Sequence, residues 1–175
     1  METHYQQKII IPIHTPVISV DKLADIWTPR ENNLDGDIRL ARLVTMKTRI
    51  SNQVSTGVLP SFHIGKRIAI NLPQLAQNDA DSRSLITSQK FTIDFTLLLS
   101  SMPMDAFAEH AGYDYGVVEG WVRKGYIPSN KHGSYRMVNM LHLLDRCLTW
   151  RADQWSDLSS RTSPQSKPVP AVRAV

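Results

Sequence analysis

Basic side chains gather in two stretches of this chain that contain no carboxylate. Residues 38–78 include neither Asp nor Glu, and their basic residues are Arg39, Arg42, Lys47, Arg49, Lys66 and Arg67. Residues 120–144 also lack Asp and Glu, and they carry Arg123, Lys124, Lys131 and Arg136. Acid-free basic surfaces attract phosphate, so the chemistry within reach is electrostatic binding of a nucleic-acid backbone. Without a fold context, the charges alone would favour an ordinary solvated basic face.

Catalytic and metal-binding patterns find little support in the sequence. The six histidines show no metal-ligand spacing, and the single cysteine cannot build a zinc site. There is no Gly-x-Ser-x-Gly motif and no phosphate-cradling glycine loop. No pair of carboxylates lies in an apolar context that would raise a pKa for acid–base work. We therefore expect a protein that is not an enzyme and needs no cofactor, with Cys147 as a buried structural thiol.

The two acid-free stretches share the residues that fix backbone shape. Residues 45–75 end in a pattern that reappears without a gap in residues 123–143. The alignment places Gly57 on Gly125, Pro60 on Pro128, Ser61 on Ser129, Gly65 on Gly133, Asn71 on Asn139 and Leu75 on Leu143. Such self-similarity predicts one small structural unit that is used twice.

Each copy predicts the same order of elements. Apolar residues at helical spacing precede the first glycine, as in Met46, Ile50 and Val54. The glycine then ends the helix, and the proline prevents it from resuming. Alternating apolar residues around Gly65-Lys66 predict a β-hairpin with a tight turn. An asparagine follows as the N-cap of a closing helix.

The segments upstream of each copy complete the predicted unit. A first helix is expected at residues 19–26 and again at residues 105–111. The first copy has an inserted loop at about residues 27–42, which is rich in turn residues. Residues 8–14 and 91–99 favour strands that lead into the two copies.

The second copy resembles a known group of DNA-binding proteins. Its pattern is similar to that of the winged-helix excisionase and MerR-type group. The pattern consists of Phe107-Ala108-Glu109, a short gap, residues 117–121, then Arg123-Lys124-Gly125-Tyr126-Ile127-Pro128 and a hairpin. The closest likeness is to the Cox regulators of temperate phages. It covers residues 104–148 well and residues 45–75 moderately. The sequence departs from this group in its doubling, in Gly116 and Gly120, and in the anionic Glu119.

This resemblance implies an α+β fold of two tandem winged helix-turn-helix units with small β-hairpin wings and a flexible C-terminal tail. We expect the first unit at residues 8–78, a linker at 79–89, the second unit at 90–155 and a disordered tail at 156–175. The implied function is sequence-specific binding of double-stranded DNA by a regulator that represses a promoter, directs excisive recombination, or both. The implied partners are further copies of the chain on DNA and a recombinase (integrase).

The expected DNA-binding residues lie on the second helix and the hairpin of each unit. In the first unit they are Lys47, Thr48, Arg49, Ser51, Asn52, His63, Lys66 and Arg67. In the second unit they are Tyr115, Arg123, Lys124, Lys131, His132, Ser134 and Arg136. Glu119 could accept a hydrogen bond from a cytosine amino group, but phosphates repel it. We therefore expect the first unit to read DNA better, and the second unit could bind protein instead. We expect Trp121 in the core.

Two alternatives remain open at this point. The units could be a protein-interaction adaptor without DNA binding, or a MerR-like activator, although no effector domain follows the second hairpin. DNA binding can be distinguished from these alternatives by the positions of four basic residues, Lys47, Arg49, Lys66 and Arg67. If they share one exposed face, DNA binding is favoured; if they are paired internally, it is disfavoured. No signal peptide or membrane-spanning stretch is recognisable, so we expect a cytoplasmic protein of a bacterial or phage-infected cell.

Overall fold

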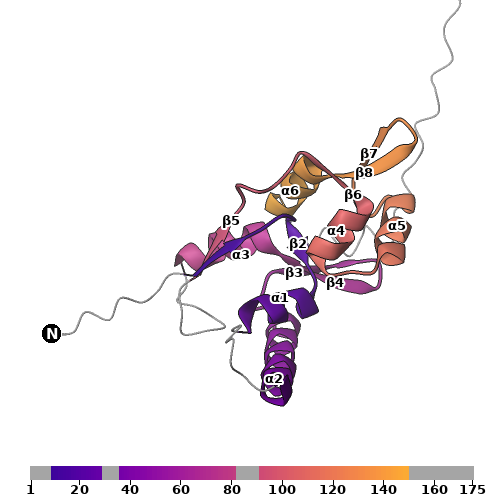
Figure 1. The fold of residues 1–175 in the computed structure, drawn as a ribbon. Helices are drawn as coiled ribbons and strands as arrows, with labels where there is room; N and C mark the ends of the chain where they lie inside the picture. Colours follow the sequence, from indigo (N-terminus) through magenta and orange to yellow (C-terminus); the bar gives the residue numbers. More distant parts are fainter. Residues whose placement is uncertain (1–8, 29–35, 82–90, 150–175) are drawn as a thin grey trace, which may run out of the picture.

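The computed structural model describes residues 9–28, 36–81 and 91–149 (Figure 1). Over these ranges the chain is mixed α+β, with six helices and two small three-stranded antiparallel sheets, so the predicted class is confirmed. Three predicted segments lie outside the described residues: the tail at residues 156–175, residues 150–155 of the second unit, and most of the linker.

The two halves of the chain repeat one order of elements. The first half contains β2 (Val17–Ile18), α1 (Val20–Trp27), α2 (Gly36–Ser55), β3 (Ser61–Ile64), β4 (Arg67–Asn71) and α3 (Leu72–Asp81). The second half contains β6 (Ser101–Pro103), α4 (Met104–Ala111), α5 (Tyr115–Arg123), β7 (Ser129–His132), β8 (Tyr135–Asn139) and α6 (Met140–Leu148). The sheet orders, β2-β4-β3 and β6-β8-β7, also correspond. The repetition predicted from the sequence is therefore present in the described chain.

The lead-in segments join the two halves. Strand β1 (Ile9–Pro12) pairs in parallel with β5 (Phe91–Asp94), with Ile9 opposite Phe91 and Ile11 opposite Ile93. Strands were predicted at residues 8–14 and 91–99, and the structure confirms them at these shorter ranges. After Asp94 the chain turns, because the Asp94 carboxylate accepts a hydrogen bond of 2.9 Å from the backbone N–H of Thr96.

The residues that align in the repeat carry out the same local tasks. Gly57 and Gly125 have φ angles of 74° and 73°, and they follow the ends of α2 and α5. The Asn71 side chain accepts from the backbone N–H of Gln74 at 3.2 Å, and Asn139 accepts from that of His142 at 2.9 Å. These bonds satisfy backbone donors at the start of α3 and α6, as the sequence predicted.

Two predicted boundaries are wrong. The loop expected at residues 27–42 is helical over residues 36–42, because α2 begins at Gly36 and Trp27 is the last residue of α1. Leu43 and Met46 pack against the first core and extend its apolar helix face upstream, so the helix continues there. The linker expected at residues 79–89 is helical over residues 79–81, because no Gly or Pro interrupts α3 after Pro73.

The apolar core divides unequally between the halves. One cluster lies within the first half around Leu23, Ile50 and Ile70. The other cluster holds residues of the second half, including Phe107, Trp121 and Cys147, together with Val17, Phe62, Ile64 and Ala69 from the first. The hairpin β3–β4 is therefore a packing element of the second half. Trp121 and Cys147 are buried as predicted, and burial raises the pKa of the Cys147 thiol to about 12.

Three hydrogen bonds reinforce the contact between the halves. The backbone N–H of Ser19 donates to the carbonyl of Ala111 at 2.8 Å. The Tyr113 hydroxyl donates to the carbonyl of Ile68 at 2.7 Å, and burial raises the pKa of Tyr113, which keeps this donor protonated. The Asn71 amide donates to the carbonyl of Cys147 at 2.9 Å. The Asn71 bond is buried, and a buried, satisfied polar group of this kind fixes one relative orientation of the halves.

Replacement of Gly112 by alanine tests the closest approach between α1 and α4. Gly112 has a φ of 74°, and a Cβ atom there would lie 2.6 Å from Lys22 Cβ and 2.7 Å from Ser19 Oγ. Gly125 has a φ of 73° with nothing within 4 Å, so Gly125→Ala is the matched control. The control should lose about 1–2 kcal/mol of unfolding free energy from backbone strain. Gly112→Ala should lose clearly more in urea titrations, and equal losses would show that this contact is loose.

A pair of stacked histidines makes the stability of the contact depend on pH. The rings of His14 and His110 lie 4.3 Å apart, and Lys22 and Glu109 are the other charged groups that act on His110. Burial, and then His14, lowers the pKa of His110 below its usual 6.5, and Glu109 partly offsets this. The unfolded chain therefore binds more protons than the folded chain once the pH falls below 6.5.

The free energy of unfolding should accordingly decrease as the pH falls through 6.5 towards the lower pKa of the folded state. Urea midpoints measured between about pH 8 and about pH 5 test this. The variant His110→Asn removes the titrating group and should show a weaker decrease than the native protein. The same pH dependence in both proteins would contradict the assignment to His110.

Candidate nucleic-acid interface

Five of the seven predicted residues of the second half meet in one groove between α5 and the hairpin β7–β8, and Lys124 and Lys131 do not line it. The groove has a volume of about 960 Å³, and its floor includes Pro103, Met104 and Val122. The side chains with hydrogen-bonding or charged groups along it are Asp105, Tyr115, Glu119, Arg123, His132, Ser134, Tyr135 and Arg136. Five of these, Tyr115, Arg123, His132, Ser134 and Arg136, were predicted from the sequence as DNA-binding residues.

Helix α5 presents its polar side to the groove because its apolar side is fixed in the core. Val118, Trp121 and Val122 are buried. Tyr115, Glu119 and Arg123 recur every four residues, so they lie one above another on an exposed side of the helix. Gly120, next to this row, has nothing within 4 Å of a Cβ position. The accessible surface of α5 is thus one row of three functional side chains beside a nearly bare backbone.

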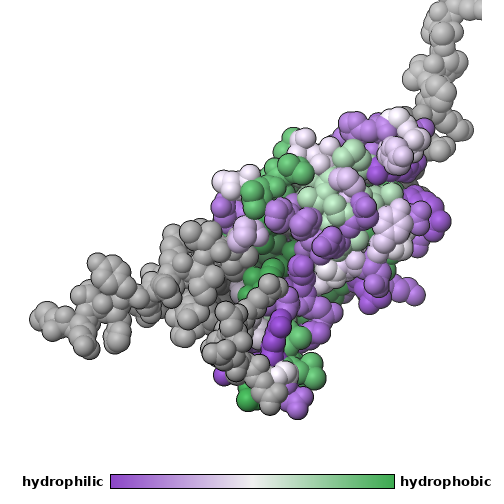
Figure 2. Space-filling model, viewed as in Figure 1, coloured by the Kyte–Doolittle hydropathy of each residue, from purple (hydrophilic) through white to green (hydrophobic). Residues whose placement is uncertain are grey.

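The hairpin β7–β8 places two cations directly opposite each other. The strand register pairs Lys131 with Arg136, and both side chains are exposed. Neither has an ion-pair partner among the described residues. Like charges on directly opposite strand positions destabilise a hairpin, and a bound anion would relieve that repulsion. Figure 2 shows mainly hydrophilic side chains over this hairpin, at the upper right of the view.

Two further residues complete the description of the second half. Lys124 follows the last residue of α5, and its ammonium lies 5.8 Å from the centroid of the Tyr126 ring. It does not line the groove. Tyr135 does line the groove and is 77% exposed, but it was not among the residues predicted from the sequence. The hairpin register, in which Tyr135 lies opposite His132, is the signal that would have found it.

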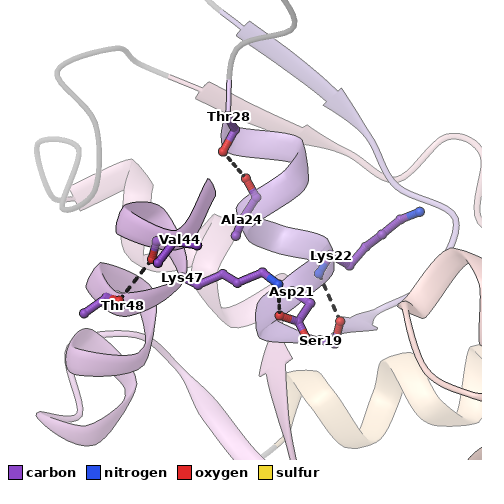
Figure 3. Close-up of polar contacts among 8 residues, drawn as sticks. All are labelled: Ser19, Asp21, Lys22, Ala24, Thr28, Val44, Lys47 and Thr48. Atoms are coloured by element: carbon purple, nitrogen blue, oxygen red, sulfur yellow. Dashed lines mark hydrogen bonds and ion pairs between the residues drawn. The ribbon is translucent and has the colours of Figure 1, made fainter. Parts of the chain in front are cut away.

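The predicted residues on α2 of the first half do not form a comparable surface. The ammonium of Lys47 lies 2.7 Å from the carboxylate of Asp21 (Figure 3). The hydroxyl of Thr48 donates to the carbonyl of Val44 at 3.0 Å (Figure 3). Arg49, Ser51 and Asn52 are exposed along the rest of the helix. Lys47 is therefore neutralised by an acid that lies outside the acid-free stretch.

The predicted residues on the first hairpin share an acid with α2, because Asp21 pairs with Lys47 and also lines the hollow of Lys66 and Arg67. His63 is exposed on β3. Lys66 and Arg67 line a separate hollow together with Asp21, Glu109 and Asp114. The basic residues Lys47, Lys66 and Arg67 of the first half are therefore paired with acids or lie beside them. This arrangement removes the geometric basis for expecting the first unit to be the better DNA surface.

The cause is the apolar character of the first hairpin. Phe62, Ile64 and Ala69 are buried against the second half. At Gly65 a Cβ atom would lie 3.2 Å from the Tyr126 ring, so the turn itself sits against the second half. The corresponding residues of the second hairpin are Asn130, His132 and Met137, none of which is buried. One hairpin is therefore a packing element, and the other is free to contact a ligand.

Helix α2 also exposes apolar residues. Ile38, Leu40 and Val44 are 48%, 60% and 55% exposed. Figure 2 shows hydrophobic side chains among hydrophilic ones over this helix, at the bottom of the view. Exposed apolar groups of this kind are typical of protein contacts.

Comparisons with protein-family models, curated proteins and solved structures found no match to this chain. Within the described residues, no helix combines the length and the apolar character that crossing a membrane requires. Function is therefore inferred from the surface itself.

Proposed function

We propose that the protein binds double-stranded DNA through α5 and the hairpin β7–β8, and that each half of the chain is a winged helix-turn-helix unit. The observation that carries the proposal is the exposed pair of Lys131 and Arg136, held directly opposite each other on the hairpin, with Arg136 also lining the groove beside the polar row of α5. Backbone phosphates are the anions that such a pair would bind on DNA. The order of helix, helix, hairpin and helix in the second half supports the same assignment.

The arrangement suits the way in which winged helices bind DNA. The second helix enters the major groove, and the hairpin contacts the backbone or the minor groove. Arg123 would donate to a guanine edge, and Glu119 would accept from a cytosine amino group. Ser134 and Arg136, at the turn of the hairpin, would bind phosphates. Glu119 and Asp105 lower the attraction to DNA in general, which favours binding that depends on base contacts.

The biological role follows from the resemblance to the Cox and excisionase group. We propose a regulator that represses a promoter, directs excisive recombination, or does both, in the cytoplasm of a bacterial or phage-infected cell. Further copies of the chain on DNA and an integrase are the proposed partners. The residues that carry DNA contact are those of the second half, whereas the first half supports them through β3–β4.

A salt titration tests DNA binding. Fluorescence anisotropy would follow the native protein on a duplex of about 30 base pairs across about 50–200 mM salt. Each phosphate contact should add about 0.9 to the slope of log affinity against log salt concentration. A slope of about two or more is expected, because Lys131 and Arg136 both take part. Absence of binding at the lowest salt concentration would contradict the proposal.

A protein-interaction adaptor is the second candidate. It is favoured by the exposed apolar residues Ile38, Leu40 and Val44 on α2. It predicts no binding to a duplex even at low salt, so the same titration separates the two candidates.

A further inference from the structure

The tip of the second hairpin carries two aromatic rings on one face. Tyr135 lies opposite His132 in the strand register, so both side chains project from the same face of the hairpin. Tyr135 is 77% exposed, which is the highest value among the large apolar and aromatic residues that are exposed in the described chain. In the first hairpin the position of Tyr135 is taken by Arg67.

Among the described residues of the second half, Tyr113 and Tyr126 have structural partners, whereas no hydrogen bond or ring contact holds Tyr135 or Tyr115. The Tyr113 hydroxyl is bonded to the carbonyl of Ile68, and its ring packs against Trp121. Tyr126 packs against Gly65, and the ammonium of Lys124 lies over its ring in a cation–π contact. Tyr135 makes no contact of either kind, so nothing in the described fold accounts for an aromatic ring at this position.

The cations near the two rings indicate which kind of ligand the rings would bind. Lys131 and Arg136 alternate with His132 and Tyr135 along the strands, so they lie on the other face of the same tip. Exposed aromatic rings next to backbone-binding cations are the composition of surfaces that stack on unpaired bases. A paired base offers no free face to such a ring, whereas an unpaired base does.

We infer that Tyr135 and His132 form a stacking platform for an unpaired nucleobase, so that the protein prefers a duplex with unpaired bases beside the hairpin to a fully paired duplex. This inference rests on the proposed DNA-binding function. Lys131 and Arg136, on the opposite face of the hairpin tip, bind backbone phosphates of the strand that passes around the tip, while α5 remains on the adjoining duplex.

The test compares a fully paired duplex with the same duplex interrupted by a short single-stranded gap, by anisotropy at one salt concentration. The native protein should bind the gapped DNA about 5- to 150-fold more tightly, the range expected for one stacked base. Tyr135→Phe keeps the ring and should keep this preference. Tyr135→Ala should abolish the preference, so that its affinities for the gapped and the paired DNA become equal within about twofold.

Two results would overturn the inference. They are equal affinity of the native protein for both DNAs, and a preference that survives in Tyr135→Ala, as it would if that variant lost affinity for both DNAs equally. Lys131→Ala is the charge control, because it should weaken both complexes alike and lower the salt slope by about 0.9. If the native protein binds neither DNA, the proposed function itself fails. If it binds the paired duplex without preference, only the stacking platform fails.

Discussion

Alanine at both Lys131 and Arg136 is expected to lower the affinity for duplex DNA by about tenfold or more at about 0.1 M salt. The salt slope should fall by about 1.8, since each lost phosphate contact removes about 0.9. The two side chains lie opposite each other on an exposed hairpin without an ion-pair partner in the described structure. Anisotropy titrations at several salt concentrations would measure both quantities.

The control for this variant removes the same charges from the first hairpin. Lys66→Ala/Arg67→Ala should change affinity by less than about threefold, because those residues share their hollow with Asp21, Glu109 and Asp114. Loss of folding is excluded by urea titration, since removing two opposed cations should leave the stability of Lys131→Ala/Arg136→Ala unchanged or slightly higher. Equal losses of affinity in the two double variants would contradict the assignment of binding to the second hairpin.

Phe62→Ala is expected to lower the free energy of unfolding by about 3–5 kcal/mol. Phe62 is 4% exposed and belongs to the cluster that also holds Phe107 and Trp121 of the second half. Its truncation leaves a cavity where the two halves meet, so both halves should lose stability together. Urea unfolding followed by tryptophan fluorescence and by circular dichroism would measure the change.

The second hairpin supplies the matched control for Phe62. Asn130 is the corresponding residue there and is exposed, so Asn130→Ala should change stability by no more than about 0.5 kcal/mol. In Phe62→Ala the two signals should still report a single transition at lower urea. Two separated transitions, or a loss no larger than that of Asn130→Ala, would show that the halves are stable independently of each other.

The features predictable from the sequence are those encoded by neighbouring residues. Gly57 and Gly125 end helices, and Asn71 and Asn139 cap them, through conformations and bonds that span three or four residues. Because these residues recur at the same spacing in both halves, the duplicated order of helices and strands was predictable from the sequence alone. The same local rules predicted the row of Tyr115, Glu119 and Arg123 on α5.

Features that depend on contacts between distant segments were not predictable. Phe62 and Ile64 alternate as expected for a buried strand face, but alternation does not say which neighbour covers that face. Lys47 was predicted as a DNA-binding residue in a stretch without acids, yet the carboxylate of Asp21 on α1 lies 2.7 Å from its ammonium. The expectation that the first half binds DNA better than the second depended on both of these contacts, the burial of the first hairpin and the pairing of Lys47.

The contact between the halves joins unlike surfaces, since the hairpin of one half rests on the helices of the next. Between separate molecules, a contact of unlike surfaces that does not close into a ring produces an open fibre. For such a fibre to grow, the second hairpin would need an apolar face like that of the first hairpin, so that it could pack on the next molecule. Asn130, His132 and Met137 stand at the positions of Phe62, Ile64 and Ala69, so the series stops after two units. Any assembly of whole molecules along DNA must therefore use a different surface.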